Sequence, residues 1–164
     1  VELSKKSSKV TAIDIHDKNK RVEKMLIDEK IQNIELMKHN IFEDALLTDQ
    51  KFDNVICSSV MEHLKQDQID CGVKNIYECL KKGGSYLVGF PLKNRLMNSI
   101  FKIYENTYQK LNKNKVYNFS LEDDHPSGQH EIIPSLEKHF EIEEKKYFFN
   151  MFLPIYVVLK CKKV

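Results

Sequence analysis

Polar side chains follow three apolar runs of this chain, at the points where such runs would end as buried strands. Asp14 ends the run in "VTAIDIH", Asn40 precedes "IFED" after a second run, and Ser58 and Ser59 follow "FDNVIC". A carboxylate accepts two hydrogen bonds and donates none, and amide and hydroxyl oxygens also accept them. Because an open, mostly parallel sheet binds its ligand at the carboxyl ends of its strands, these residues predict a ligand site at one edge of a sheet.

Three histidines are candidate acid–base groups. His63 lies in "MEHL" after the third run, and His125 and His130 flank a Pro and a Gly in the loop "EDDHPSGQHE". A neutral imidazole near an acceptor group can take its proton at physiological pH. Two plainer interpretations stay open: His63 caps or packs beside the following helix, and the loop is an exposed polar turn.

Strands alternate with helices along the chain, which is typical of a parallel sheet. The pattern predicts strands at 10–15, 34–39, 52–57 and 85–90, the third of them buried on both faces. It predicts helices after Asp17, at about 69–80 with Gly83 and Gly84 as the stop, at about 96–111, and from Pro134 to His139. The last two strands, 142–149 and 155–161, have no helix between them, so we expect an antiparallel hairpin.

Composition limits the class of protein. With 164 residues and 41% hydrophobic content, the chain 1–164 is expected to form a single domain. The 26 basic and 24 acidic side chains leave a formal charge of +2, so charge alone gives no reason to expect nucleic acid as a partner. The longest apolar runs are shorter than the roughly 20 residues of a membrane helix, and a cytoplasmic protein is predicted.

The cysteines indicate structural thiols. Cys57, Cys71, Cys79 and Cys161 have no CxxC or other metal-ligand spacing, so no metal site is expected. Most of them lie inside apolar patterns, where a thiol behaves as a small hydrophobe. Reduced cysteines in a reducing compartment are the prediction.

Four segments taken together resemble a known family. "VTAIDIH", "NIFED", "FDNVICSSVMEHL" and "LKKGGSYLVGFP" occur in this order between about Lys9 and Pro91. The set resembles the class I S-adenosylmethionine-dependent methyltransferases, in the broad group that modifies small molecules. The resemblance implies a Rossmann-like α/β fold: a mostly parallel sheet with helices on both faces and a C-terminal antiparallel hairpin. It also implies that the strand at 155–161 lies antiparallel beside the strand at 85–90.

The resemblance implies roles for two residues at the first strand end. Asp14 would hold the two ribose hydroxyls of S-adenosylmethionine, and Ile15 would pack near the adenine. A carboxylate suits the first role because it accepts two hydrogen bonds. The alternative is that Asp14 is a helix N-cap.

Further cofactor contacts are implied after the second and third strands. Asn40 occupies the place where the family usually has an acid for the adenine amino group, and Ile41 beside it is also expected to bind the cofactor. The Asn40 amide oxygen can still accept a hydrogen bond, although this residue could instead serve only in a turn. Ser58 and Ser59 lie where the family's loop passes the methionine part of the cofactor.

The family's glycine-rich cofactor loop is not found in this sequence. The five glycines, at 72, 83, 84, 89 and 128, include no GxG arrangement. We therefore expect an N-terminally incomplete domain, with its first, central strand missing between the strands that begin at Val10 and Phe52. The segment 92–135 is expected to be a substrate lid or insert within the domain.

Three functions follow as hypotheses. The leading one is methyl transfer from S-adenosylmethionine to an oxygen, nitrogen or carbon of a small-molecule acceptor. The second is a non-catalytic fragment or partner-binding module that keeps the fold, which the missing glycine loop favours. The third is a nicotinamide-dependent oxidoreductase, since Rossmann proteins also place an acid after the second strand; the segment pair "FDNVICSSVMEHL" and "LKKGGSYLVGFP" and the final hairpin speak against it. The acceptor and the oligomeric state are not predicted.

Overall fold

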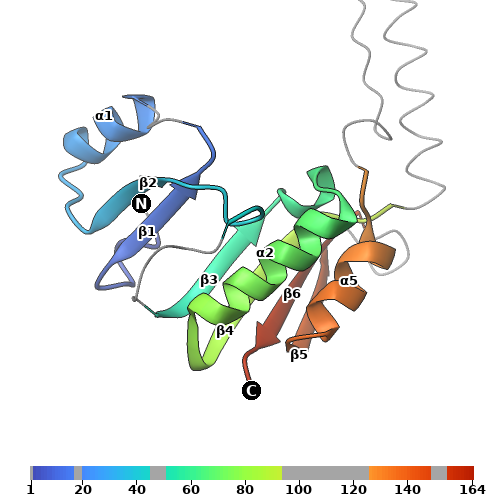
Figure 1. Cartoon of the computed structure of the whole chain (residues 1–164). Coiled ribbons are helices and arrows are strands. Elements are labelled where there is room, and N and C mark those ends of the chain that lie inside the picture. Colours follow the sequence, from blue (N-terminus) through green and yellow to red (C-terminus); the bar gives the residue numbers. More distant parts are fainter. Residues whose placement is uncertain (1, 17–19, 45–50, 94–125, 149–154) are drawn as a thin grey trace, which may run out of the picture.

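The fold combines two parallel strand pairs with a C-terminal antiparallel hairpin (Figure 1). The computed structural model describes residues 2–16, 20–44, 51–93, 126–148 and 155–164. The elements are β1 (Val10–Asp14), α1 (Lys20–Asp28), β2 (Ile34–Lys38), β3 (Phe52–Ser58), the 3-10 turn η1 (Met61–His63), α2 (Gln66–Cys79), β4 (Leu80–Pro91), α5 (Gln129–Glu137), β5 (Glu141–Phe148) and β6 (Tyr156–Lys162).

Two sheets contain these strands. β1 pairs with β2 in parallel, and the second sheet has the order β3-β4-β6-β5, in which β3 and β4 are parallel. β6 runs antiparallel to both β4 and β5, so the predicted hairpin and the insertion of its last strand beside β4 are confirmed. Each parallel pair is joined through a helix: α1 lies between β1 and β2 in the chain, and α2 between β3 and β4, as parallel neighbours require.

The facing edges of β1 and β3 are open among the residues that the structure describes. No ladder of hydrogen bonds joins the two sheets there, and this is the place where the family resemblance implies the missing central strand. Ile13 of β1 is 36% exposed and Ile56 of β3 is 51% exposed. The prediction that the strand beginning at Phe52 is buried on both faces is therefore wrong for this structure: Val55 and Cys57 pack against the core on one face, whereas Ile56 on the other face stays half-exposed.

The core lies between the four-stranded sheet and helices α2 and α5, which pack side by side on one of its faces (Figure 1). Alternate residues of β4 and of β6 point into this core, as the two-residue period of a strand requires. Burying each large apolar side chain stabilises the fold by about 1.5–3 kcal/mol. The fully buried side chains include Ile69, Val73, Ile76, Tyr86, Val88, Phe90, Ile132, Leu136, Val157 and Leu159.

Helix α2 ends before the glycines that were predicted to stop it. Its last residue is Cys79, and Leu80 already has extended geometry, with φ −81° and ψ 145°. The Leu80 side chain is 1% exposed, so its burial in the core accounts for the early exit from the helix. Gly83 and Gly84 lie farther on, inside β4, where Gly83 has φ +73°.

Helix α5 begins at Gln129, so the prediction of a helix opened by Pro134 is wrong. The N–H of Gly128 donates to Glu131 Oε2 at 2.8 Å, which satisfies one free donor at the helix start. Pro134 lies within the helix and removes one backbone donor there. His130 consequently belongs to the first turn of α5 instead of a loop. The predicted helix at 96–111 lies outside the described residues. Asp17, the predicted cap of the first helix, lies outside them as well.

The loop after β2 docks on helix α2 through a glycine. Phe42 is 8% exposed and its ring lies directly over Gly72, where an added Cβ would overlap the ring. Gly72 is therefore required for close packing, not for an unusual backbone angle. This contact connects the chain segment that carries β1 and β2 to the main core.

Substitution of this glycine tests the docking. In an exposed helix Gly→Ala would stabilise by up to about 1 kcal/mol, whereas overpacking of a filled site costs about 1–3 kcal/mol. We expect Gly72→Ala to lower the free energy of unfolding in urea, and to raise it in a Phe42→Ala background, where the ring is gone. An equal effect in both backgrounds would contradict the docking.

Candidate functional site

Asp14 ends β1 with its carboxylate held by the following turn. Oδ1 accepts the N–H of His16 at 2.8 Å, and Oδ2 has no partner among the described residues. The bond goes to His16, several residues before α1 begins at Lys20, so Asp14 is not the N-cap of that helix. A shallow hollow beside the carboxylate is lined by Ala12, Ile13, Asp14, His16, Val22, Leu36, Met37 and Lys38.

Asn40 occupies the turn after β2, next to the end of β1. Its Oδ1 accepts the N–H of Phe42 at 3.1 Å, and its C=O accepts from Glu43 and Asp44. The turn role that was left open is therefore present, and the amide oxygen keeps a second lone pair. Ile41 is partly buried against the core. Because β1 and β2 are parallel neighbours, Asp14 and Asn40 lie at the same edge of their sheet.

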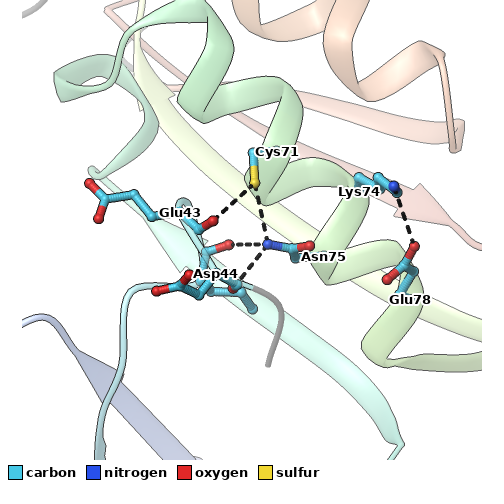
Figure 2. Close-up of polar contacts among 7 residues, drawn as sticks. Glu43, Asp44, Cys71, Lys74, Asn75 and Glu78 are labelled. Carbon is cyan, nitrogen blue, oxygen red and sulfur yellow. Dashed lines mark hydrogen bonds and ion pairs between the residues drawn. The ribbon is translucent and has the colours of Figure 1, made fainter. Parts of the chain in front are cut away.

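Asn75 of α2 holds this turn in place (Figure 2). Its side-chain nitrogen donates to the carbonyl oxygens of Ile41 at 2.8 Å and of Asp44 at 3.0 Å. The Asn75 residue is 7% exposed. The Cys71 thiol adds a weak bond to the Glu43 carbonyl, 3.6 Å away. Sequence reasoning missed Asn75; the available signal was a polar residue within the apolar stripe of α2.

Ser58 and Ser59 lie at the carboxyl end of β3 and share one partner. The Tyr156 hydroxyl is 2.8 Å from Ser58 Oγ and 3.1 Å from Ser59 Oγ. Tyr156 is 97 residues away from Ser59 in sequence and was not among the predicted site residues. These serines belong to the second sheet, so the structure does not bring them into one ladder with Asp14.

His63 stands beside a buried acid in η1. The His63 side chain is 50% exposed, and its Nε2 lies 4.0 Å from Glu62 Oε1. Glu62 is buried, and its Oε2 has no hydrogen-bond partner in the part of the chain that the structure describes. Burial raises the pKa of the Glu62 carboxyl, and its own backbone N–H and nearby His63 oppose that shift. A buried carboxyl with an unsatisfied oxygen is a feature often found at functional sites.

The start of α5 docks on η1 and on the residues after β4. Ser127 donates from its N–H to the Glu62 carbonyl at 3.2 Å and from its Oγ to the Leu64 carbonyl at 2.6 Å. Gln129 exchanges two hydrogen bonds with the Lys93 backbone, at 2.9 and 2.7 Å. His130, next to Gln129, is exposed. The hydrogen bonds of Ser127 place the start of α5, which carries His130, against η1, which carries His63. His125 is outside the described residues.

The cysteines are free in this structure. Burial raises the pKa of the Cys57 thiol to about 11 and that of Cys161 to about 12, so both stay protonated at neutral pH. In the described part of the chain, no group of His, Cys, Asp and Glu side chains could hold a metal ion. No helix within the described ranges is both long enough and apolar enough for a membrane span.

A family model described as "Methyltransferase domain" matches residues 1–84, slightly more than half of the chain. No curated protein matches the chain significantly in sequence.

Solved structures show the same fold at low identity. The N-methyltransferase NodS from Bradyrhizobium japonicum WM9, in complex with S-adenosyl-L-homocysteine, is 14% identical with a TM-score of 0.62, over 94% of this chain and 66% of that one. The magnesium protoporphyrin IX methyltransferase ChlM from Synechocystis PCC 6803, with bound S-adenosylhomocysteine, is 15% identical with a TM-score of 0.70, over 100% and 68%. An S-adenosylmethionine-dependent methyltransferase from Clostridium acetobutylicum ATCC 824 is 14% identical with a TM-score of 0.70, over 98% and 77%. The chain thus spans about two thirds of the first two proteins.

The raised pKa of Glu62 predicts a pH-dependent stability. The folded state holds the proton more tightly than the unfolded chain, in which the pKa of a Glu carboxyl is about 4.3. Stability therefore falls as the pH rises from that value through the raised pKa of the folded state. Glu62→Gln is neutral at every pH. We expect this variant to gain stability relative to the wild type between pH 4 and pH 8, as measured by urea unfolding.

The control is Glu137→Gln, which changes an exposed acid on α5. Its difference from the wild type should stay nearly constant over the same pH range. A Glu62→Gln difference that also stays constant with pH would show that burial does not perturb the Glu62 carboxyl.

Proposed function

This chain belongs to the methyltransferase-domain family that its first 84 residues match, and from that premise we propose that the protein transfers a methyl group from S-adenosylmethionine to a small-molecule acceptor. The acceptor atom is an oxygen, nitrogen or carbon. The observation that carries the proposal is the Asp14 carboxylate, which the His16 N–H holds at the carboxyl end of β1 with Oδ2 left for a ligand.

The polar groups present fit the cofactor's polar groups. Asp14 would accept the two ribose hydroxyls, since an ionised carboxylate has acceptor sites to spare. Ile15, which is 55% exposed, would contact the adenine, together with Ile41. Asn40 Oδ1 would accept from the adenine amino group with its second lone pair. Ser58 and Ser59 would bind the methionine end.

When bound, S-adenosylmethionine supplies a methyl group that its sulfonium already makes electrophilic. The main task left to the protein is alignment of the acceptor, which can contribute up to about 7–11 kcal/mol. For a hydroxyl or amine acceptor, a histidine would take the proton. His63 and His130 are the described candidates because α5 docks on η1, and His125 remains a third; the segment 92–135 would shape the acceptor pocket.

A second candidate function is a partner-binding module without catalysis. The observation that favours it is that, among the described residues, β1 and β3 lie in two separate sheets, so Asp14 and Ser58 share no ladder there. The match to a methyltransferase model gives no support to a nicotinamide-dependent oxidoreductase. We further propose that the enzyme works in the cytoplasm and needs neither nucleic acid nor a metal ion.

Substitution of Asp14 tests the cofactor site. Loss of charge-assisted hydrogen bonds costs about 1.5–3 kcal/mol, so Asp14→Ala should weaken binding of S-adenosylhomocysteine about 10- to 100-fold in calorimetry. Asp14→Asn keeps an acceptor for the His16 N–H and should lose less. The melting temperature should change little in either variant.

The matched control for this experiment is Asp28→Ala, at the exposed end of α1, which should bind like the wild type. If Asp14→Ala lowers stability and leaves the affinity unchanged, Asp14 is a structural turn residue. Absence of binding by the wild type would favour the partner-binding module.

The histidines are separated by a turnover assay with tritiated methyl transfer to an identified acceptor. A general base contributes typically about 10²- to 10⁴-fold, so replacing the responsible histidine should lower kcat by such a factor. His63→Ala, His125→Ala and His130→Ala are compared, each with its affinity for S-adenosylhomocysteine as the control. Unchanged turnover in all three would rule out histidine base catalysis.

A further inference from the structure

Tyr156 reaches across one strand to the end of another. It lies in β6, which pairs with β4, yet its hydroxyl bonds to Ser58, the last residue of β3, and to the following Ser59. The crossing takes place over Gly89 of β4, where an added Cβ would lie 2.8 Å from the tyrosine oxygen. A side chain at Gly89 would therefore push the Tyr156 ring away from the serines.

The residue that Tyr156 holds has an uncommon backbone conformation. Ser59 has φ +54°, in the left-handed region that costs a non-glycine residue free energy, and strain of this kind gathers at functional sites. Its N–H donates to the Gly89 carbonyl at 2.8 Å, and its Oγ bonds to Tyr156. The Tyr156 ring is in turn supported by the edge of Phe148, with ring centroids 6.4 Å apart.

The hydroxyl cluster has one proton more than it uses internally. Ser58, Ser59 and Tyr156 together carry three O–H protons, and the two hydrogen bonds between them consume two. At least one O–H is therefore left to donate to a ligand. Both serines are exposed, so that donor is accessible at the carboxyl edge of the sheet.

We propose that Tyr156 is a positioning residue that orients the Ser58 and Ser59 hydroxyls toward the amino-acid end of the cofactor. The inference rests on the proposed function, because it assigns the serines to S-adenosylmethionine. The carboxylate at that end is a strong acceptor for the spare hydroxyl proton. Tyr156 itself acts through the serines and needs no contact with the reacting atoms.

Calorimetry with two probes tests this role. S-adenosylhomocysteine carries the amino-acid end, whereas 5′-methylthioadenosine keeps the nucleoside and lacks that end. Tyr156→Phe removes only the hydroxyl, so its affinity for S-adenosylhomocysteine should fall about 3- to 10-fold, the effect of one or two hydrogen bonds, while that for 5′-methylthioadenosine stays unchanged. Asp14→Asn should weaken both probes.

The control is Tyr147→Phe in β5, whose side chain is exposed and which should bind both probes like the wild type. A Ser58→Ala, Ser59→Ala double variant should weaken S-adenosylhomocysteine in the same way, and adding Tyr156→Phe to it should have no further effect.

Three outcomes would overturn the inference. Unchanged affinity of Tyr156→Phe for S-adenosylhomocysteine would remove the role of the hydroxyl. An equal loss for both probes would show that the tyrosine only maintains the fold. If the wild type binds neither probe, the proposed function itself fails and the inference fails with it, whereas the first two outcomes leave the proposed function intact.

Discussion

The docking of the loop after β2 on helix α2 fixes how the two halves of the candidate site lie relative to each other. In the part of the chain that the structure describes, no ladder joins β1 to β3, so the ribose-side residue Asp14 and the serines after β3 are not connected through a sheet. Asn75 satisfies two loop carbonyls with one amide nitrogen, and Phe42 fills the notch over Gly72. Loss of the Asn75 amide would remove a donor from both carbonyls, and the Asp44 carbonyl would keep only His39 Nε2, 3.3 Å away. A buried carbonyl left unsatisfied costs about 1–3 kcal/mol.

This arrangement divides the stability of the molecule unevenly. The core cluster is built from β4, β6, α2, α5 and their neighbours, and Phe42 is its one buried member from the chain before Lys51 among the described residues. Local opening follows the number of buried apolar contacts, so β1, α1 and β2 belong to the less stable end of the molecule. A ligand that contacts both Asp14 and Ser58 would bind the folded arrangement better than any opened one, and so would stabilise the less stable half.

The order of elements could be predicted because each one is encoded locally. Apolar periodicity and cap residues predict the elements from β1 to β6 without knowledge of the core. The lack of a helical pattern between the last two strands predicts the antiparallel hairpin. Burial could not be predicted in the same way: the apolar run from Phe52 indicates a strand buried on both faces, but whether each face is covered depends on which elements pack over it, and a single strand pattern does not show this. Pro134 misled because Gly128 and Glu131 supply an earlier helix start. Asn75 and Tyr156 act on residues 34 and 97 positions away, which no local pattern reveals.

The glycines show how a site can be organised without a glycine-rich loop among the described strands. Gly72 and Gly89 lie on different elements, and each makes room for an aromatic ring from a distant part of the chain, Phe42 in one case and Tyr156 in the other. Near the Phe42 ring, Asn75 forms two hydrogen bonds with the turn that carries Asn40. The Tyr156 ring carries its own hydroxyl, which bonds to Ser58 and Ser59. A ring in a glycine notch sets the distance between two elements, and hydrogen bonds set the orientation of the loop, since the first is short-ranged repulsion and the second is directional. The same combination therefore positions both ends of the proposed cofactor site. Each end depends on the absent Cβ of a glycine inside a helix or strand, where the sequence pattern does not show which side chain packs against it.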